Sequence, residues 1–192
     1  MDYFAVIDTE TNWIDQVMSI GVVIADSCTF QAVDAKYYVL TPEYEIGGMY
    51  EQVLFPDQRL HPVVCDREAS MAELLQWFGR YGVTDIFAYN AGFDYNHLPE
   101  LSKLQWYDII RLAAYRQFNP HIPACAQCCS TGRMKRNYGV EPMLRLLSGN
   151  GSYHETHNAL YDAMDELQIM RLLGYSPDAY LPMKTSGKKG RA

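Results

Sequence analysis

The sequence predicts a mixed α/β domain built around one β-sheet. Two features indicate this class: three strand-like segments follow one another near the start, and helical segments then alternate with single short strands. The chain has 192 residues, of which 48% are hydrophobic and 20% are charged, which is typical of a globular protein rather than a disordered one. This length fits one domain with its own core.

The first predicted strand begins at Tyr3 and runs without a polar break into two carboxylates, Asp8 and Glu10. A continuous apolar run is typical of a strand buried on both faces. Because side chains alternate along a strand, Asp8 and Glu10 project to the same side. Two buried negative charges repel each other, and a divalent cation such as Mg²⁺ or Mn²⁺ would remove that conflict. A metal site is one interpretation, and a polar turn capped by Asp8 is the other.

Two further strands are predicted at residues 18–25 and 36–40, and their short connections indicate an antiparallel meander. Residues 42–67 read as irregular, because glycine and proline recur there. A helix follows, with Ser70 as its N-cap and Glu73 completing a capping box.

The second half of the chain alternates short strands with helices. Its last helix shows the clearest amphipathic pattern, with apolar residues spaced by three and four. Strands are expected at 85–89 and 106–108, and helices at 94–101, 109–118, 139–147 and 158–173.

Three of the five cysteines cluster at Cys125, Cys128 and Cys129, shortly after His121. Cys-x-x-Cys is half of a zinc site, but no second pair at a suitable spacing completes it. Free thiols in a reducing cytosol are the favoured interpretation.

Charge and hydropathy limit the classes of partner. A net charge of −7 argues against non-specific wrapping of nucleic acid, although not against holding a few phosphates through a bound metal. No apolar stretch is long enough for a membrane span, and the N-terminus lacks the basic start of a secretory signal. We therefore expect a cytoplasmic protein with a single domain over residues 1–176 and a basic, flexible tail over residues 177–192.

Acidic residues recur where a site would form. Asp94 follows the fourth strand and Asp162 lies on the last helix, so three distant segments supply four carboxylates, the number that two divalent cations need. His157 precedes Asp162 by five residues, which on one helix would place them about 140° apart. His157 therefore belongs on the loop before the helix, where it could serve as a general base.

Three motifs resemble those of a known family. Asp-Thr-Glu-Thr at 8–11, Asn-Ala-Gly-Phe-Asp at 90–94 and His-Asn-Ala-Leu-Tyr-Asp-Ala at 157–163 resemble the three exonuclease motifs of the DEDD 3′–5′ exonucleases. The histidine of the third motif is similar to that of the DEDDh subclass. The motifs occur in the family's order, and the resemblance extends over most of the chain, residues 3–173.

The resemblance implies a ribonuclease H-like fold, with a mixed five-stranded sheet flanked by helices. It also implies a 3′–5′ exonuclease that releases nucleoside 5′-monophosphates from single-stranded DNA, RNA or both. Two Mg²⁺ or Mn²⁺ ions would be held by four carboxylates, and His157 would deprotonate the attacking water. The carboxylates that match the family's metal ligands are those of Asp8, Glu10, Asp94 and Asp162.

Four further residues match positions that face the substrate: Thr9, Thr11, Asn90 and Phe93. By the resemblance, the two threonines contact the terminal nucleotide, partly through their backbone. Phe93 either stacks near a base or belongs to the core.

Four other titratable residues near the motifs have lesser expected roles. Asp165 and Glu166 on the last helix are expected to be solvated or salt-bridged, His154 is a second-choice base, and Asp108 is expected to cap or support the site.

Two other functions stay open at this point: a nucleic-acid-binding module with weak or no catalysis, and a hydrolase of short oligoribonucleotides. The sequence also leaves open the choice between DNA and RNA, and whether the chain forms a homodimer or associates with a polymerase.

Overall fold

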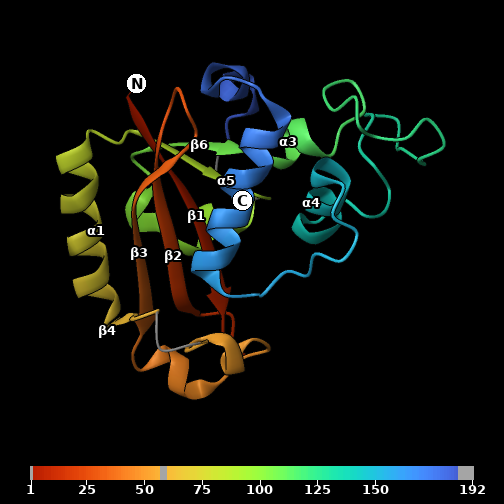
Figure 1. Cartoon of the computed structure of the whole chain (residues 1–192). Coiled ribbons are helices and arrows are strands. Elements are labelled where there is room, and N and C mark those ends of the chain that lie inside the picture. The colour runs from red at the N-terminus through yellow and green to blue at the C-terminus, as the bar shows by residue number, and fades with distance from the viewer. Residues whose placement is uncertain (1, 57–59, 186–192) are drawn as a thin grey trace, which may run out of the picture.

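A computed structural model describes residues 2–56 and 60–185. These residues form a six-stranded mixed sheet with helices on both faces (Figure 1). The strand order across the sheet is β4-β3-β2-β1-β5-β6. The strands are β1 (Tyr3–Thr11), β2 (Val17–Asp26), β3 (Ala32–Leu40), β4 (Val63–Cys65), β5 (Asp85–Ala88) and β6 (Gln105–Asp108).

The first three strands form the predicted antiparallel meander, and β5 and β6 lie parallel to β1. Because β1 and β5 are parallel neighbours, with Val6 opposite Phe87, the segment that follows β5 emerges beside Asp8. The chain therefore brings two of its three motifs to one edge of the sheet.

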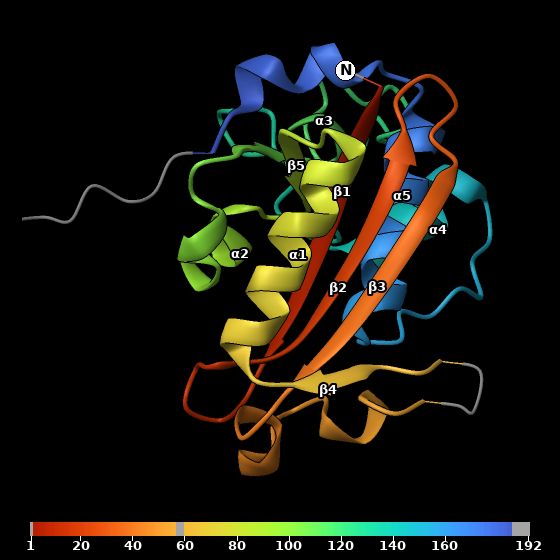
Figure 2. The ribbon, with the colours of Figure 1, turned by 90° about the vertical axis from the view of Figure 1, so that its left-hand side faces the viewer.

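Helices α1 (Arg67–Tyr81) and α5 (Ala159–Leu173) cover opposite faces of the sheet (Figure 2). Alternate residues of β1 enter the two cores: Phe4 and Val6 face α5, whereas Ala5 and Ile7 face α1. By the same alternation, Asp8 and Glu10 project toward the α5 face. The remaining helices are α2 (Gly92–His97), α3 (Ile110–Ala113) and α4 (Val140–Ser148), with short 3-10 turns η1 (Glu43–Ile46), η2 (Glu51–Val53), η3 (Pro99–Leu101) and η4 (Pro177–Met183).

Gly21 allows the first turn of α5 to approach strand β2 closely. It lies opposite Asp8 on β2, and a Cβ atom there would lie 2.1 Å from the carbonyl of Ala159. Any side chain at Gly21 would therefore push the first turn of α5 away from Asp8. The glycine permits the close approach that brings the third motif to the first.

Three sequence-based boundaries were wrong. The sheet has a sixth strand, β4, within the stretch expected to be irregular, where three residues pair in parallel with β3. Helix α1 begins earlier than expected, because the side chain of Asp66 accepts a hydrogen bond from Ala69 N (2.7 Å) and forms the N-cap. Ser70 lies inside this helix, fully buried. The helix expected at 109–118 is only one turn long, α3.

The segment expected to be a flexible tail begins with packed residues. Its first part forms η4, in which Tyr180 is completely buried, and Thr185 N donates to the carbonyl of Trp106 at 2.8 Å. The ordered domain thus extends past the boundary predicted at residue 176. Residues 186–192 lie outside the described part of the chain.

No helix within the described residues is long and apolar enough to cross a membrane.

Candidate active site

The five residues expected to form a site come from four elements that meet at one edge of the sheet. Asp8 and Glu10 end β1, Asp94 lies in the first turn of α2, and Asp162 lies in the first turn of α5. His157 precedes the N-cap of α5, on the loop where the helical geometry required it.

Glu10, His157 and Asp162 lie closest together. Each offers a ligand atom within 4.8 Å of the others, and among the described residues this is the one such group suited to a metal ion. His157 adopts a left-handed backbone conformation (φ 57°), which turns the chain sharply before the helix. The ring of Tyr50 stacks on the imidazole, with centroids 4.2 Å apart and an interplanar angle of 18°. The histidine is therefore held between a strained turn and an aromatic face.

Asn158 anchors this loop. Its side-chain oxygen caps α5, and its amide donates to Val53 O (2.7 Å) and to the Tyr37 hydroxyl (2.9 Å). These bonds join the start of α5 to the segment that carries Tyr50. The positions of His157 and of its stacking partner Tyr50 are thereby linked.

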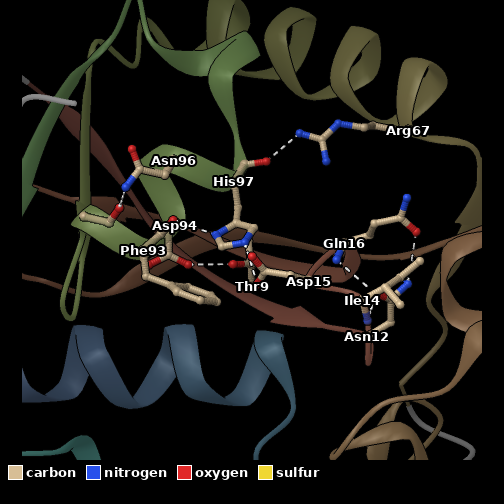
Figure 3. A network of polar contacts seen from close by, with 11 residues as sticks. Thr9, Asn12, Ile14, Asp15, Gln16, Arg67, Phe93, Asp94, Asn96 and His97 are labelled. Atoms are coloured by element: carbon tan, nitrogen blue, oxygen red, sulfur yellow. Dashed lines mark hydrogen bonds and ion pairs between the residues drawn. The ribbon is translucent and has the colours of Figure 1, made fainter. Parts of the chain in front are cut away.

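Asp94 is fixed from β1. The hydroxyl of Thr9 donates to Asp94 Oδ1 at 2.8 Å, and both side chains are buried (Figure 3). The turn before α2 is held by Asp108, whose Oδ1 accepts from the backbone amides of Asn90 (3.0 Å) and Ile110 (3.2 Å). Asp108 therefore has the supporting role expected from the sequence.

Burial and mutual repulsion raise the pKa values of the carboxyl groups in this cluster, so these groups bind protons more tightly than exposed carboxyls do. Burial, followed by repulsion from Asp162, raises the pKa of Glu10 to about 9. Burial raises the pKa of Asp162 to about 8 and that of Asp94 to about 7, although the Thr9 hydrogen bond lowers the latter. The pKa of Asp8 also lies well above its usual range, through burial and then the charge of Asp94. Such an arrangement attracts cations strongly.

The donor set fits divalent metal ions. Within the described part of the chain, Asp8 Oδ2, Asp162 Oδ1 and Glu166 Oε2 are buried without a hydrogen-bond donor. Buried carboxylate oxygens without donors are costly unless a cation or a proton accompanies them. Oxygen ligands suit Mg²⁺ and Mn²⁺. The observed chemistry therefore agrees with the metal site inferred from the motifs.

Several solved structures share this architecture. The nuclease domain of 3′hExo, a DEDDh family member, bound to rAMP, matches with a TM-score of 0.62 and 15% identity over 88% of this chain and 90% of that one. A full-length 3′-exonuclease gives a TM-score of 0.64 with 14% identity, over 100% and 92% of the two chains. Exonuclease X in complex with 5′ overhanging duplex DNA gives 0.55 with 18% identity, over 94% and 98%.

The fold is that of the DEDDh 3′-exonucleases. It is the ribonuclease H-like fold expected from the motifs, with one strand more than predicted. No protein-family model and no curated protein matches the sequence. At 13–18% identity, the likeness to these structures establishes the exonuclease fold and not the substrate.

The four residues expected to face the substrate differ in exposure and in contacts. Thr9 is buried and its hydroxyl is committed to Asp94, so any nucleotide contact would use its backbone. Thr11 is half-buried. Asn90 is exposed, with a left-handed φ of 63°. Phe93 is exposed and packs against the ring of His97, so the alternative of a core residue is wrong.

Glu166 contradicts the expectation from the sequence. It is 1% exposed rather than solvated, and burial together with the charges of Asp94 and Asp162 raises its pKa. It follows Asp162 by four residues and so lies on the same face of α5. That spacing was the available signal, and Glu166 joins the buried Asp94 and Asp162 and the half-buried Asp8 and Glu10 as a fifth carboxylate in the cluster.

The other titratable residues near the third motif point elsewhere. Asp165 is half-buried and accepts a hydrogen bond from the Tyr153 hydroxyl. The exposed imidazole of His154 contacts Arg145 and Glu141 on α4, and it lies outside the Glu10 group. The five cysteines are free, and those near His121 form no metal-binding group within the described residues.

Proposed function

We propose that this protein is a metal-dependent 3′–5′ exonuclease of the DEDDh class, acting on single-stranded DNA, RNA or both. The observation that carries the proposal is the meeting of His157, Glu10 and Asp162 within 4.8 Å, beside the buried carboxylates of Asp8 and Asp94. A histidine among buried carboxylates supplies both a base and a cation site. Burying a histidine and several carboxylates together costs free energy that packing alone does not recover.

In the proposed reaction the four carboxylates have one role and His157 has another. Asp8, Glu10, Asp94 and Asp162 hold two divalent cations, Mg²⁺ or Mn²⁺. When bound, these ions supply the positive charge that favours attack by water and departure of the 3′ oxygen. His157 accepts the proton of the attacking water, and the stacked ring of Tyr50 keeps the imidazole in place. The product is a nucleoside 5′-monophosphate.

The structural neighbours support a nucleic-acid substrate and leave its sugar open. Among the solved structures that share the fold, one holds rAMP, one concerns recognition of a histone mRNA stem-loop and one holds a dA16 oligonucleotide. Both RNA-directed and DNA-directed enzymes therefore use this architecture. Discrimination would depend on contacts to the 2′-hydroxyl.

The test uses 5′-labelled single-stranded DNA and RNA of several lengths, incubated with Mg²⁺ or Mn²⁺. We expect a ladder that shortens from the 3′ end and disappears with EDTA or in Asp8→Ala. Asp2→Asn, which removes an exposed carboxylate outside the cluster, serves as the control and should behave as the parent. Intact substrate with every metal, together with measurable binding, would identify a binding module instead. Cleavage restricted to the shortest RNAs would identify an oligoribonucleotide hydrolase.

A further inference from the structure

The loop that brings His157 to the site runs from α4 to the start of α5 (Figure 1). Residues 149–157, the His157 loop, contain neither helix nor strand. Within the described part of the chain, the one backbone–backbone hydrogen bond inside this loop joins Tyr153 N to Asn150 O (3.3 Å). Because a segment with so few backbone bonds opens easily, the position of His157 depends on the side chains that hold the loop.

Two residues of α4, Glu141 and Arg145, supply such side chains. Arg145 Nε donates to Tyr153 O at 2.7 Å, and Glu141 Oε2 accepts from Glu155 N at 3.0 Å. The two residues are one helical turn apart and form an ion pair at 2.8 Å. The Glu155 amide, followed by the charge of Arg145, lowers the pKa of Glu141, so its carboxylate is ionised and accepts strongly. The pair therefore binds the backbone of the loop at two points.

Helix α4 is a firm support for this pair. Its apolar residues Met143 and Leu144 are buried in the core that also contains α5, and α4 packs against α5. The hydroxyl of Tyr153 donates to Asp165 on α5, so the loop is also attached to the helix that follows it. The ion pair thus holds the loop against a body that is itself fixed by packing.

The His157 loop is fixed on both sides of the imidazole. Glu155, two residues before His157, is held by Glu141, and Asn158, the next residue, is held by Val53 and Tyr37. Two residues remain between these points, and His157 has the left-handed φ of 57°. Loss of the bond to Glu155 would therefore release the side of the loop from which His157 is presented.

We propose that Glu141 and Arg145 are positioning residues, whose ion pair holds the His157 loop so that the imidazole lies beside Glu10 and Asp162. The proposal rests on the proposed function. Neither residue belongs to the carboxylate cluster, and both act through the placement of His157. A displacement of about 1 Å in a catalytic group can lower a rate by about 10²-fold. Loss of the pair should therefore lower kcat while metal binding is kept.

The first test is amide hydrogen exchange followed by NMR in EDTA, which needs neither metal nor substrate. In Glu141→Ala the amide of Glu155 should exchange about 10- to 100-fold faster than in the wild type, the factor expected for one hydrogen bond to a charged group. The amide of Val6, on the central strand β1, should keep its rate. An unchanged rate at Glu155, or equal acceleration at Val6, would overturn the proposal.

The second test asks whether the pair acts through His157. Glu141→Ala should lower kcat for a single-stranded 12-mer by about 10- to 100-fold and leave KM and the calorimetric affinity for Mn²⁺ within about threefold. In the His157→Ala background, the same substitution should change kcat by less than about twofold, because the group that it positions is already absent. Glu73→Ala removes the acidic partner of Lys36 from an ion pair between α1 and β3, on the other face of the sheet, and is the matched control.

The outcomes distinguish the two proposals. An unchanged kcat of Glu141→Ala would refute the positioning role while the exonuclease assignment stands. An equal fall in kcat with and without His157 would indicate an effect that does not pass through the base, and it would also refute the role. Failure of the wild type to hydrolyse the 12-mer would refute the proposed function, and the exchange rate at Glu155 would then still decide whether Glu141 holds the loop.

Discussion

Without metal, replacing Asp162 by asparagine should stabilise the protein, and more so at high pH. Burial and repulsion raise the pKa of Glu10 to about 9 and that of Asp162 to about 8, whereas unfolded carboxyls titrate near 4. Between these values the native state binds more protons than the unfolded state. The free energy of unfolding therefore falls as pH rises from about 4 to 9. Asp162→Asn removes one of the two charges responsible.

The distance between the groups gives the magnitude. Oxygens of Glu10 and Asp162 lie within 4.8 Å, and two unit charges at that separation repel by about 3.5 kcal/mol at an effective dielectric constant of about 20. Because Glu10 is about half ionised at pH 9, roughly half of this repulsion acts there. For a chain of this length, each kcal/mol shifts Tm by about 2–4 °C. We expect Asp162→Asn to raise Tm by about 4–7 °C at pH 9 and hardly at pH 5.

The assay is thermal unfolding followed by circular dichroism in EDTA from pH 5 to 9, repeated with saturating Mn²⁺. Mn²⁺ should stabilise the wild type more than Asp162→Asn, because the substitution removes a ligand. Asp2→Asn, which alters an exposed carboxylate, should show no pH-dependent difference from the wild type. A lower Tm of Asp162→Asn at pH 9 in EDTA, or an effect equal at pH 5 and pH 9, would refute the reasoning.

Substitutions at three further residues test the surroundings of the proposed metal site. His157→Ala should lower kcat by about 10²- to 10⁴-fold, which is the usual contribution of a general base. Calorimetry should show that this variant largely keeps Mn²⁺ binding. Normal turnover would exclude His157 as the base. Tyr50→Ala should lower kcat severalfold and affect KM less. Tyr50→Phe keeps the ring stacked on His157 and should match the wild type. An equal fall in kcat in both variants would show that loss of stacking does not cause it. Thr9→Val removes the hydrogen bond to Asp94. In a calorimetric titration this variant should bind Mn²⁺ about 10- to 100-fold more weakly. An unchanged affinity would show that the hydrogen bond does not orient this carboxylate.

The parts of the site that could be predicted from sequence are those set by backbone periodicity. Asp8 and Glu10 follow an apolar run and alternate, so their shared side of β1 follows from the spacing of the two residues. The helical angle between His157 and Asp162 likewise placed the histidine on the preceding loop, where it lies in the folded chain. Both inferences needed only local geometry.

The parts that could not be predicted depend on contacts between distant segments. The spacing of four residues puts Glu166 on the same face of α5 as Asp162, but its burial among the carboxylates depends on how α5 packs on the sheet, where Ala159 lies close to Gly21. Strand β4 exists because three residues pair with β3, which no periodicity reveals over so short a length. Tyr180 is buried against a core assembled from earlier elements, whereas composition alone suggests a free tail.

The release of the 3′-terminal nucleotide tests the central claim most directly. A single strand labelled on its last nucleotide is incubated with Mn²⁺ and either the wild type or Asp94→Asn, and the labelled product is identified by chromatography. We expect the wild type to release a single labelled nucleoside 5′-monophosphate, with none in EDTA and a loss of at least about 10²-fold in Asp94→Asn. Labelled oligonucleotides as the first product, or equal release by Asp94→Asn, would contradict the assignment.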